Sequence, residues 1–115
     1  MSTISEPYSG TATIGTTEWS LTNDSSTIAT KTDQGVLQVV LDLSALTATE
    51  VFEMYFYEKV ISSGSQKRCR RYTFSGVQQD DGAVSPSMAV KHGWDVTLKK
   101  ISGTDRSITW SVRLI

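Results

Sequence analysis

The chain has 115 residues, a net charge of −1 and a sequence pI of about 5.7. This charge balance excludes a strong overall attraction to nucleic acid or to an anionic membrane. The length suffices for one hydrophobic core, and no apolar run approaches the ~20 residues that a membrane-spanning helix needs. Sixteen Ser and fifteen Thr, with few residues that favour helices, predict an all-β protein.

Residues 1–10 contain Ser, Thr, Glu and Pro without hydrophobic periodicity, and they predict an extended N-terminal arm. This segment has neither the basic start nor the apolar stretch of a secretory signal. Residues 11–115 are expected to form a single β-sandwich domain. The single cysteine, Cys69, excludes a disulfide within the chain and is typical of assembly in a reducing cytoplasm.

Short segments of strand-forming residues alternate with turns along the rest of the chain, and only residues 44–50 leave room for a helical turn. We expect seven or eight strands in an antiparallel two-sheet sandwich of jelly-roll or Greek-key type, with a small barrel as the alternative. The short strand candidates are residues 11–14, 18–21 and 27–32, and the longer segments include residues 36–43, 51–60, 68–74, 94–99 and 109–114.

Residues 51–74 predict a hairpin. Its favoured register sets Phe56 opposite Tyr72 and Glu58 opposite Arg70. A register half a residue earlier would set Phe56 against an arginine instead. The first register is favoured because it matches apolar with apolar side chains and acid with base.

Residues 94–114 predict a second, terminal hairpin. Leu98 then lies opposite Trp110, and Val96 lies opposite Val112. One face of this pair is apolar and the other is polar and charge-matched, as a half-buried antiparallel pair requires.

The sequence contains no recognisable catalytic or metal-binding motif. His92 is the only histidine, and one histidine with one cysteine cannot supply a typical zinc site. Asp80 and Asp81 form an acidic turn without the spaced ligands of a calcium loop. We therefore expect no enzymatic activity, no cofactor and no bound metal.

Four of the five residues 67–71 are basic, which is the sharpest local anomaly of the chain. In the favoured register Lys67 and Arg71 share a face with Tyr55 and Tyr57, and Tyr57 lies opposite Arg71. Tyrosine and arginine are enriched where proteins meet, so this face is a candidate contact with an acidic protein. In the alternative interpretation, the N-terminal arm of the same chain covers the tyrosines.

The N-terminal arm supplies two further candidate contacts, Pro7 and Tyr8. Proline is conformationally stiff, and tyrosine can bury its ring while its hydroxyl remains hydrogen-bonded. We expect this arm to become ordered only against a neighbouring molecule.

From Gly35 onward the order of segments resembles a group of small β-rich virion structural proteins of tailed bacteriophages. The segments are GVLQVVLDLSAL, VFEMYFYEKV, a basic strand, SPSMAVKHGWDVTLKK and GTDRSITWSVRLI. The resemblance implies a capsid decoration or cement protein, located in the virion after assembly in the host cytoplasm. Its partner would be the major capsid protein or another virion protein. Such a protein would act as a homo-oligomer, without a membrane and without nucleic acid as its target, and the resemblance transfers no functional residues.

The alternative function is that of a carbohydrate-binding or receptor-binding β-sandwich module of a phage fibre. Such a module needs exposed aromatic rings on which a sugar can stack. Trp94 and Trp110 fall on the expected core face, which leaves Trp19 as the remaining tryptophan for such a platform.

Overall fold

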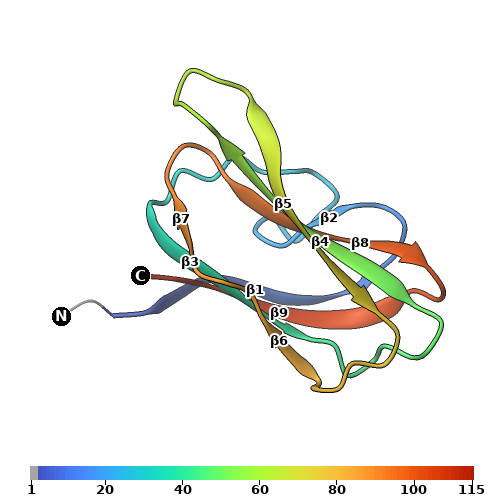
Figure 1. The fold of residues 1–115 in the computed structure, drawn as a ribbon. Helices are drawn as coiled ribbons and strands as arrows, with labels where there is room; N and C mark the ends of the chain where they lie inside the picture. The colour runs from blue at the N-terminus through green and yellow to red at the C-terminus, as the bar shows by residue number, and fades with distance from the viewer. Residues whose placement is uncertain (1–2) are drawn as a thin grey trace.

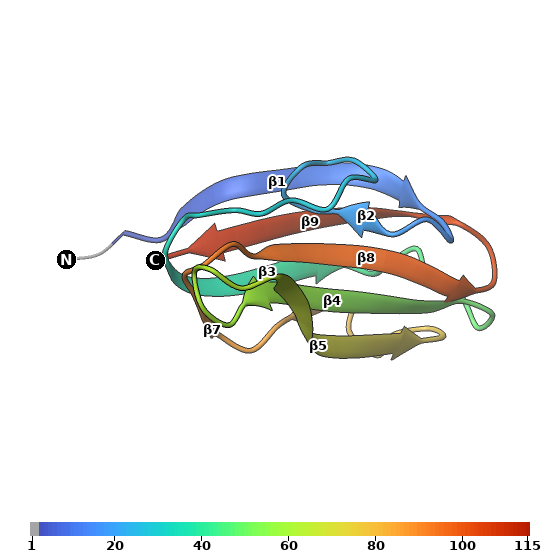
Figure 2. The same cartoon turned by 90° about the horizontal axis from the view of Figure 1, so that it is seen from above.

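Two antiparallel sheets face each other in the computed structural model, which describes residues 3–115 (Figure 1). The strands are β1 (Ser5–Ile14), β2 (Trp19–Ser20), β3 (Gly35–Asp42), β4 (Val51–Lys59), β5 (Gln66–Ser75), β6 (Gly82–Val84), β7 (Met88–Val90), β8 (Asp95–Ser102) and β9 (Arg106–Leu114). Viewed from above, β1 and β5 lie on opposite sides of the molecule (Figure 2). No helix in this part of the chain is long and apolar enough to cross a membrane.

The strand order is that of a jelly roll. The first sheet has the order β1-β9-β3-β6, with β7 also beside β3, and the second has the order β2-β8-β4-β5. Consecutive strands lie in opposite sheets, except for the pairs β4–β5 and β6–β7. Each sheet therefore contains strands from both halves of the chain.

The strand beside β3 is divided into two short strands, β6 and β7, which both pair with β3. Residues 85–87 separate them, and Pro86 in this segment has no N–H to donate to a sheet hydrogen bond. The expected all-β sandwich is confirmed. It has nine strands, instead of seven or eight, because of this break.

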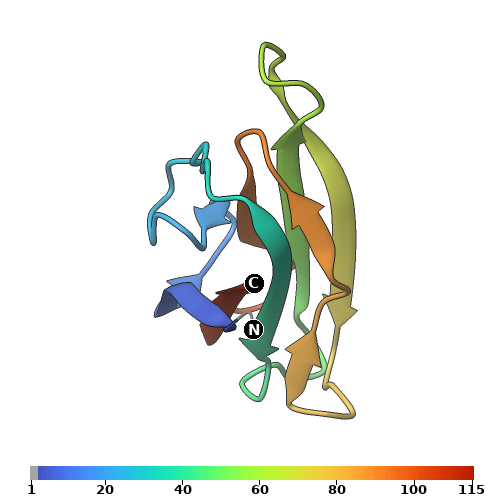
Figure 3. The same ribbon diagram turned by 90° about the vertical axis from the view of Figure 1, so that its left-hand side faces the viewer.

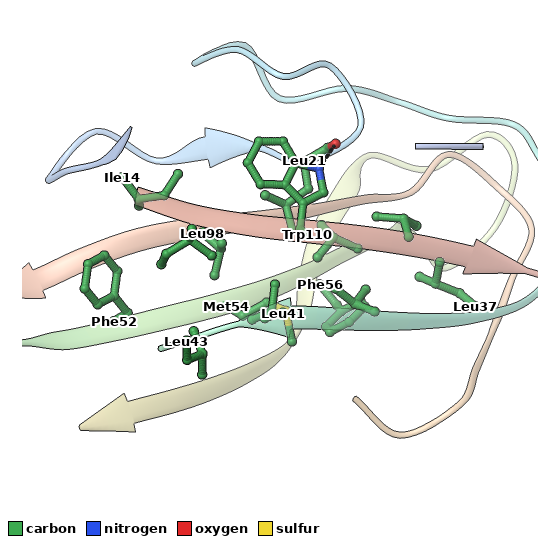
Figure 4. Close-up of a cluster of buried hydrophobic side chains, with 14 of the residues drawn as sticks. Ile14, Leu21, Leu37, Leu41, Leu43, Phe52, Met54, Phe56, Leu98 and Trp110 are labelled. Carbon is green, nitrogen blue, oxygen red and sulfur yellow. Dashed lines mark hydrogen bonds between the residues drawn. The ribbon is translucent and has the colours of Figure 1, made fainter. Parts of the chain in front are cut away.

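The core lies between the sheets and receives alternate side chains from both of them (Figure 4). Trp110 of β9 is 2% exposed, and its indole N–H donates to the carbonyl oxygen of Leu21 at 2.8 Å. Phe52 and Met54 of β4 and Leu98 of β8 belong to the same buried cluster from the opposite sheet. Burial of these large apolar side chains is the main contribution that holds the two sheets together.

The prediction that β8 and β9 form a terminal hairpin is wrong. β8 pairs with β2 and β4, whereas β9 pairs with β1 and β3, so the two strands lie in opposite sheets. Their apolar faces are still buried, because Val96 and Leu98 on one strand and Trp110 and Val112 on the other point into the core. Period-two alternation therefore identified the core-facing side chains but not the pairing partner. It also missed that Asp95 and Thr97, on the polar face of β8, are buried.

The prediction of a separate N-terminal arm is also wrong for the residues that the structure describes. Residues 5–10 form the first part of β1, which pairs with β9 up to Leu114, and residues 1–2 lie outside the described part. Tyr8 packs its ring edge-on against Trp94, with centroids 6.0 Å apart, and its hydroxyl donates to Asp33. The ammonium of Lys31 lies 5.0 Å from the centre of the Tyr8 ring. This segment is thus part of the sandwich itself.

Glu50 is a buried acid that ties the end of the sandwich together. Its carboxylate accepts hydrogen bonds from the Thr49 hydroxyl and from the Thr47 N–H, and Arg106 pairs with it at 3.0 Å. The Thr49 hydroxyl is the largest cause that holds the pKa of Glu50 well below its usual value, with the Thr47 N–H and Arg106 adding to it. Arg106 begins β9, so these contacts join the first sheet to the loop that precedes β4.

The placement of Tyr8 leads to a stability prediction with a neighbouring control. We expect Tyr8→Ala to reduce the free energy of unfolding by about 1 to 3 kcal/mol, because it removes the Trp94 contact and the Asp33 hydrogen bond. Pro7→Ala, at an exposed position one residue away, should change it by less than about 0.5 kcal/mol. Urea unfolding of both variants measures the difference. Equal stability of the two would show that the Tyr8 ring does not belong to the core.

The buried Glu50 predicts a specific acid sensitivity. A carboxylate with a lowered folded pKa stabilises the fold above its unfolded value of 4.5, and this contribution is lost as the pH falls below that value. We expect Glu50→Gln to be less stable than the parent at pH 7 and to lose less stability on acidification from pH 4.5. Thermal unfolding across this range tests it, with Asp80→Asn as the exposed control. Parallel pH profiles of Glu50→Gln and parent would contradict the assignment.

Candidate interaction surface

The hairpin of β4 and β5 extends beyond the rest of the sandwich (Figures 1 and 3). At its tip Val60 is 78% exposed and Ile61 is 60% exposed. The Gly64 N–H donates to the Ile61 carbonyl at 3.0 Å and closes the turn. These two adjacent side chains form a small apolar surface at the end of the projecting turn.

Positive charge is concentrated in the same hairpin. Residues 57–71, here called the basic hairpin, contain five Lys or Arg and one Glu. The remaining chain has six Lys or Arg against eleven Asp or Glu, so it is net acidic. The molecule therefore presents a small cationic projection on an anionic body.

A β-bulge sets the register of the hairpin. Phe56 pairs with Arg70 and Tyr57 pairs with Arg68, which leaves Cys69 as the extra residue of β5. The expected hairpin is present, but Phe56 is not opposite Tyr72. On the tip side of the bulge the alternation of side chains is reversed relative to the expectation, since one residue has been inserted.

The bulge brings Arg68, which the sequence assigned to the opposite face, over the tyrosines. Its guanidinium carbon lies 3.8 Å from the centre of the Tyr55 ring and 5.7 Å from that of Tyr57. It also donates to the Tyr57 hydroxyl at 3.2 Å and lies 3.7 Å from Glu18. This stacked arrangement fixes a partly exposed cation in one position. A bulge has no reliable sequence signal here, so neither Arg68 nor Glu18 was a predicted site residue.

The two tyrosines differ in exposure, which corrects the expectation of an exposed pair. Tyr55 is 3% exposed, and its hydroxyl donates to Glu53 at 2.6 Å. Burial, followed by the Glu53 hydrogen bond, raises the pKa of Tyr55 to about 12. Tyr57 is half-buried and donates to Glu18, and burial is the main cause that raises its pKa. Arg68 stacks over Tyr55, whereas the described part of the N-terminal segment pairs with β9 in the other sheet.

Lys67 and Arg71 lie on different faces of the hairpin. Arg71 is exposed and pairs with Tyr55, so it remains beside the tyrosines as expected, although it does not pair with Tyr57. Lys67 pairs with Glu58 on the other face, which corrects its placement. Arg70 is not neutralised by Glu58 as expected, since the Glu58 carboxylate accepts the N–H groups of Lys91 and His92.

Pro7 and Tyr8 lie away from this surface, on β1 of the other sheet. Pro7 is exposed, whereas the Tyr8 ring is used within the chain. Of the six candidate contacts, the structure therefore brings together Tyr55, Tyr57 and Arg71.

A cleft of about 420 Å³ lies between β5 and β7. Phe56, Met88 and Trp94 form part of its apolar wall, and Cys69 and Arg70 lie on the β5 side. A smaller cavity of about 70 Å³ lies between β5 and β6 and is lined by Tyr72, Phe74, Ala83 and Pro86 among others. The sandwich is thus partly open along β5.

The described residues contain neither a cluster suited to a metal ion nor a pair of exposed tryptophans on which a sugar could stack. No group of three or more His, Cys, Asp or Glu among residues 3–115 could hold a metal ion. Trp94 and Trp110 are 1% and 2% exposed, as the sequence predicted, so they cannot stack on a surface ligand. The half-buried Trp19 donates its indole N–H to Asp24 at 3.1 Å.

Comparison of the chain with protein-family models, with curated proteins and with solved structures finds no significant match.

The Tyr55–Glu53 hydrogen bond predicts an altered tyrosine titration. Because Glu53 contributes less than burial does, Glu53→Gln should lower the pKa of Tyr55 from about 12 towards, but not to, its ordinary value of 10.0. Titration of the tyrosine ring carbons by NMR measures this shift. Glu6→Gln, which affects a hydrogen bond to Ser111 on the other sheet, is the control. Ionisation of Tyr55 near 10 in the parent would contradict its burial.

Proposed function

We propose that this chain is a non-enzymatic structural protein of a virion, a capsid decoration or cement protein that binds and bridges capsid subunits. The basic hairpin is the single observation that carries the proposal. It combines projection from the body, exposed aliphatic side chains and positive charge in one element. These properties suit contact with a protein surface that has an apolar pocket and an acidic rim.

The internal order of the hairpin favours binding without a large entropic penalty. Arg68 is stacked on Tyr55 and hydrogen-bonded to Tyr57 before any partner arrives. Side chains that are already fixed lose less conformational freedom on association. Lys67, Arg70 and Arg71 make no ion pair within residues 3–115, so their charges remain available to a partner.

The charge distribution favours a protein partner over nucleic acid. Outside the basic hairpin, carboxylates outnumber cations by five. A long nucleic acid that reached the hairpin would also approach this acidic body, which would repel its phosphates. A localised acidic patch on a protein avoids that repulsion.

The jelly roll is compatible with a virion role, since capsid and lectin domains use this architecture. A virion also presents the same binding site many times. A homo-oligomer that contacts several equivalent sites gains avidity, so each single contact can be modest.

Charge reversal on the hairpin tests the proposal. We expect Arg71→Glu to slow association with purified capsids, to reduce binding and to weaken its dependence on salt, while leaving the stability nearly unchanged. Arg113→Glu is the matched control, because Arg113 is an exposed arginine on the other sheet. Co-sedimentation with capsids across a range of salt concentrations measures both variants.

Two results would contradict the proposal at different levels. If Arg71→Glu binds as well as the parent at every salt concentration, the basic hairpin is not the contact. If the parent protein itself never sediments with capsids or purified virions, the virion role is wrong.

A further inference from the structure

β5 forms an open edge of the second sheet. It has ten residues and pairs only with β4, and no other strand among residues 3–115 pairs with its outer side. The opposite edge of the same sheet is the two-residue β2, where Ser20 also bridges to Ser25. An edge strand presents unpaired N–H and C=O groups that can pair with another strand.

The other long edge, β1, is interrupted near its start by Pro7 and by a register shift between Ser5 and Tyr8, and it is regular from Tyr8 to Ile14. Unlike β5, β1 carries no lysine or arginine. β5 contains no proline, and its bulge is confined to Cys69. The segment from Arg70 to Ser75 is therefore a regular edge of six residues.

The side chains of β5 make its two faces chemically different. On the inner face, Tyr72 and Phe74 pack against the core and border the small cavity, and Arg70 lines the 420 Å³ cleft. On the outer face, Arg71 pairs with Tyr55, and Arg68 stacks on that ring. A strand added beside β5 would place alternate side chains near an apolar opening and near cations.

We propose that the free edge of β5 binds an extended segment of the partner protein in which acidic residues alternate with apolar ones. The segment adds a fifth strand to the second sheet through backbone hydrogen bonds. Its apolar side chains lie toward the β5–β6–β7 opening, and its carboxylates lie beside Arg68 and Arg71. This inference rests on the proposed function, since it specifies how the basic hairpin engages its partner.

Charge decides which occupant fits this edge. A second copy paired symmetrically across residues 67–71 would set Lys and Arg opposite Lys and Arg, and like charges across a pair destabilise it. The carboxylates of an alternating acidic strand would instead lie beside Arg68 and Arg71, where opposite charges are favourable cross-strand partners. Single-stranded nucleic acid would supply negative charge but no backbone hydrogen bonds for a sheet edge, so it serves as an outcome of the test.

Amide hydrogen exchange of the whole protein tests the proposal. The probe is a synthetic peptide as long as β5 with alternating Val and Glu, and the control is the same peptide N-methylated at alternate residues. Exchange is followed by NMR with and without the peptide. We expect the unmodified peptide to protect every second amide from Arg70 to Ser75, since alternate amides of an edge strand point outward.

The N-methylated peptide keeps its charge but loses its hydrogen-bond donors. It should bind more than about tenfold more weakly, because several backbone hydrogen bonds are lost together. Arg71→Glu should also weaken the unmodified peptide, whereas Arg113→Glu should not.

Three results would overturn the proposed edge pairing. They are equal binding of both peptides, binding without protection of β5 amides, and tighter binding of single-stranded DNA than of the unmodified peptide. If no acidic peptide binds while Arg71→Glu still impairs capsid binding, the edge pairing is wrong and the proposed function stands. If the peptide protects β5 but the protein never binds capsids, the edge pairing stands and the virion role fails.

Discussion

The burial of one face of the central strands β3, β4, β8 and β9 against the opposite sheet is the constraint on which this structure depends. Phe52, Met54 and Leu98 from the second sheet meet Trp110 and Val112 from the first within one buried cluster. A two-layer core of this kind demands period-two alternation but leaves the strand order open. The jelly-roll order then leaves β5 at an edge, where its outer side needs no partner within the fold. The free edge of β5 is thus a consequence of this strand order.

The bulge at Cys69 determines the chemistry of that hairpin. Without the extra residue, strict alternation would direct Arg68 and Arg71 to opposite faces, since they are three positions apart. With it, Arg68 covers Tyr55 while Arg71 pairs with the same tyrosine. Bulges commonly redirect side chains at functional sites, and here one residue places a stacked cation and an exposed cation together.

The fold class and the buried faces could be predicted from the sequence because both depend on local alternation. The pairing of β8 could not, since an apolar face fits equally well beside β9 or across the core from it. Tyr8 was misplaced for a related reason: its partners, Asp33 and Trp94, are distant in sequence. For the candidate site, the sequence located the basic segment and Tyr57, but the bulge decided which cation meets which ring. These misses depend on long-range contacts or on one inserted residue, neither of which leaves a local pattern.

The positive charge on the β5 edge allows this edge to stay open for a partner without pairing with a second copy of the chain. An open edge strand risks pairing with a second copy of itself, and natural proteins oppose this with charged edge residues. Lys67, Arg68, Arg70 and Arg71 supply such a barrier, while the acidic remainder keeps the molecule close to neutral. The barrier acts only against like charge, so it leaves the edge open to an acidic strand. The four cations therefore oppose self-association, and Arg68 and Arg71 among them also favour the proposed acidic partner.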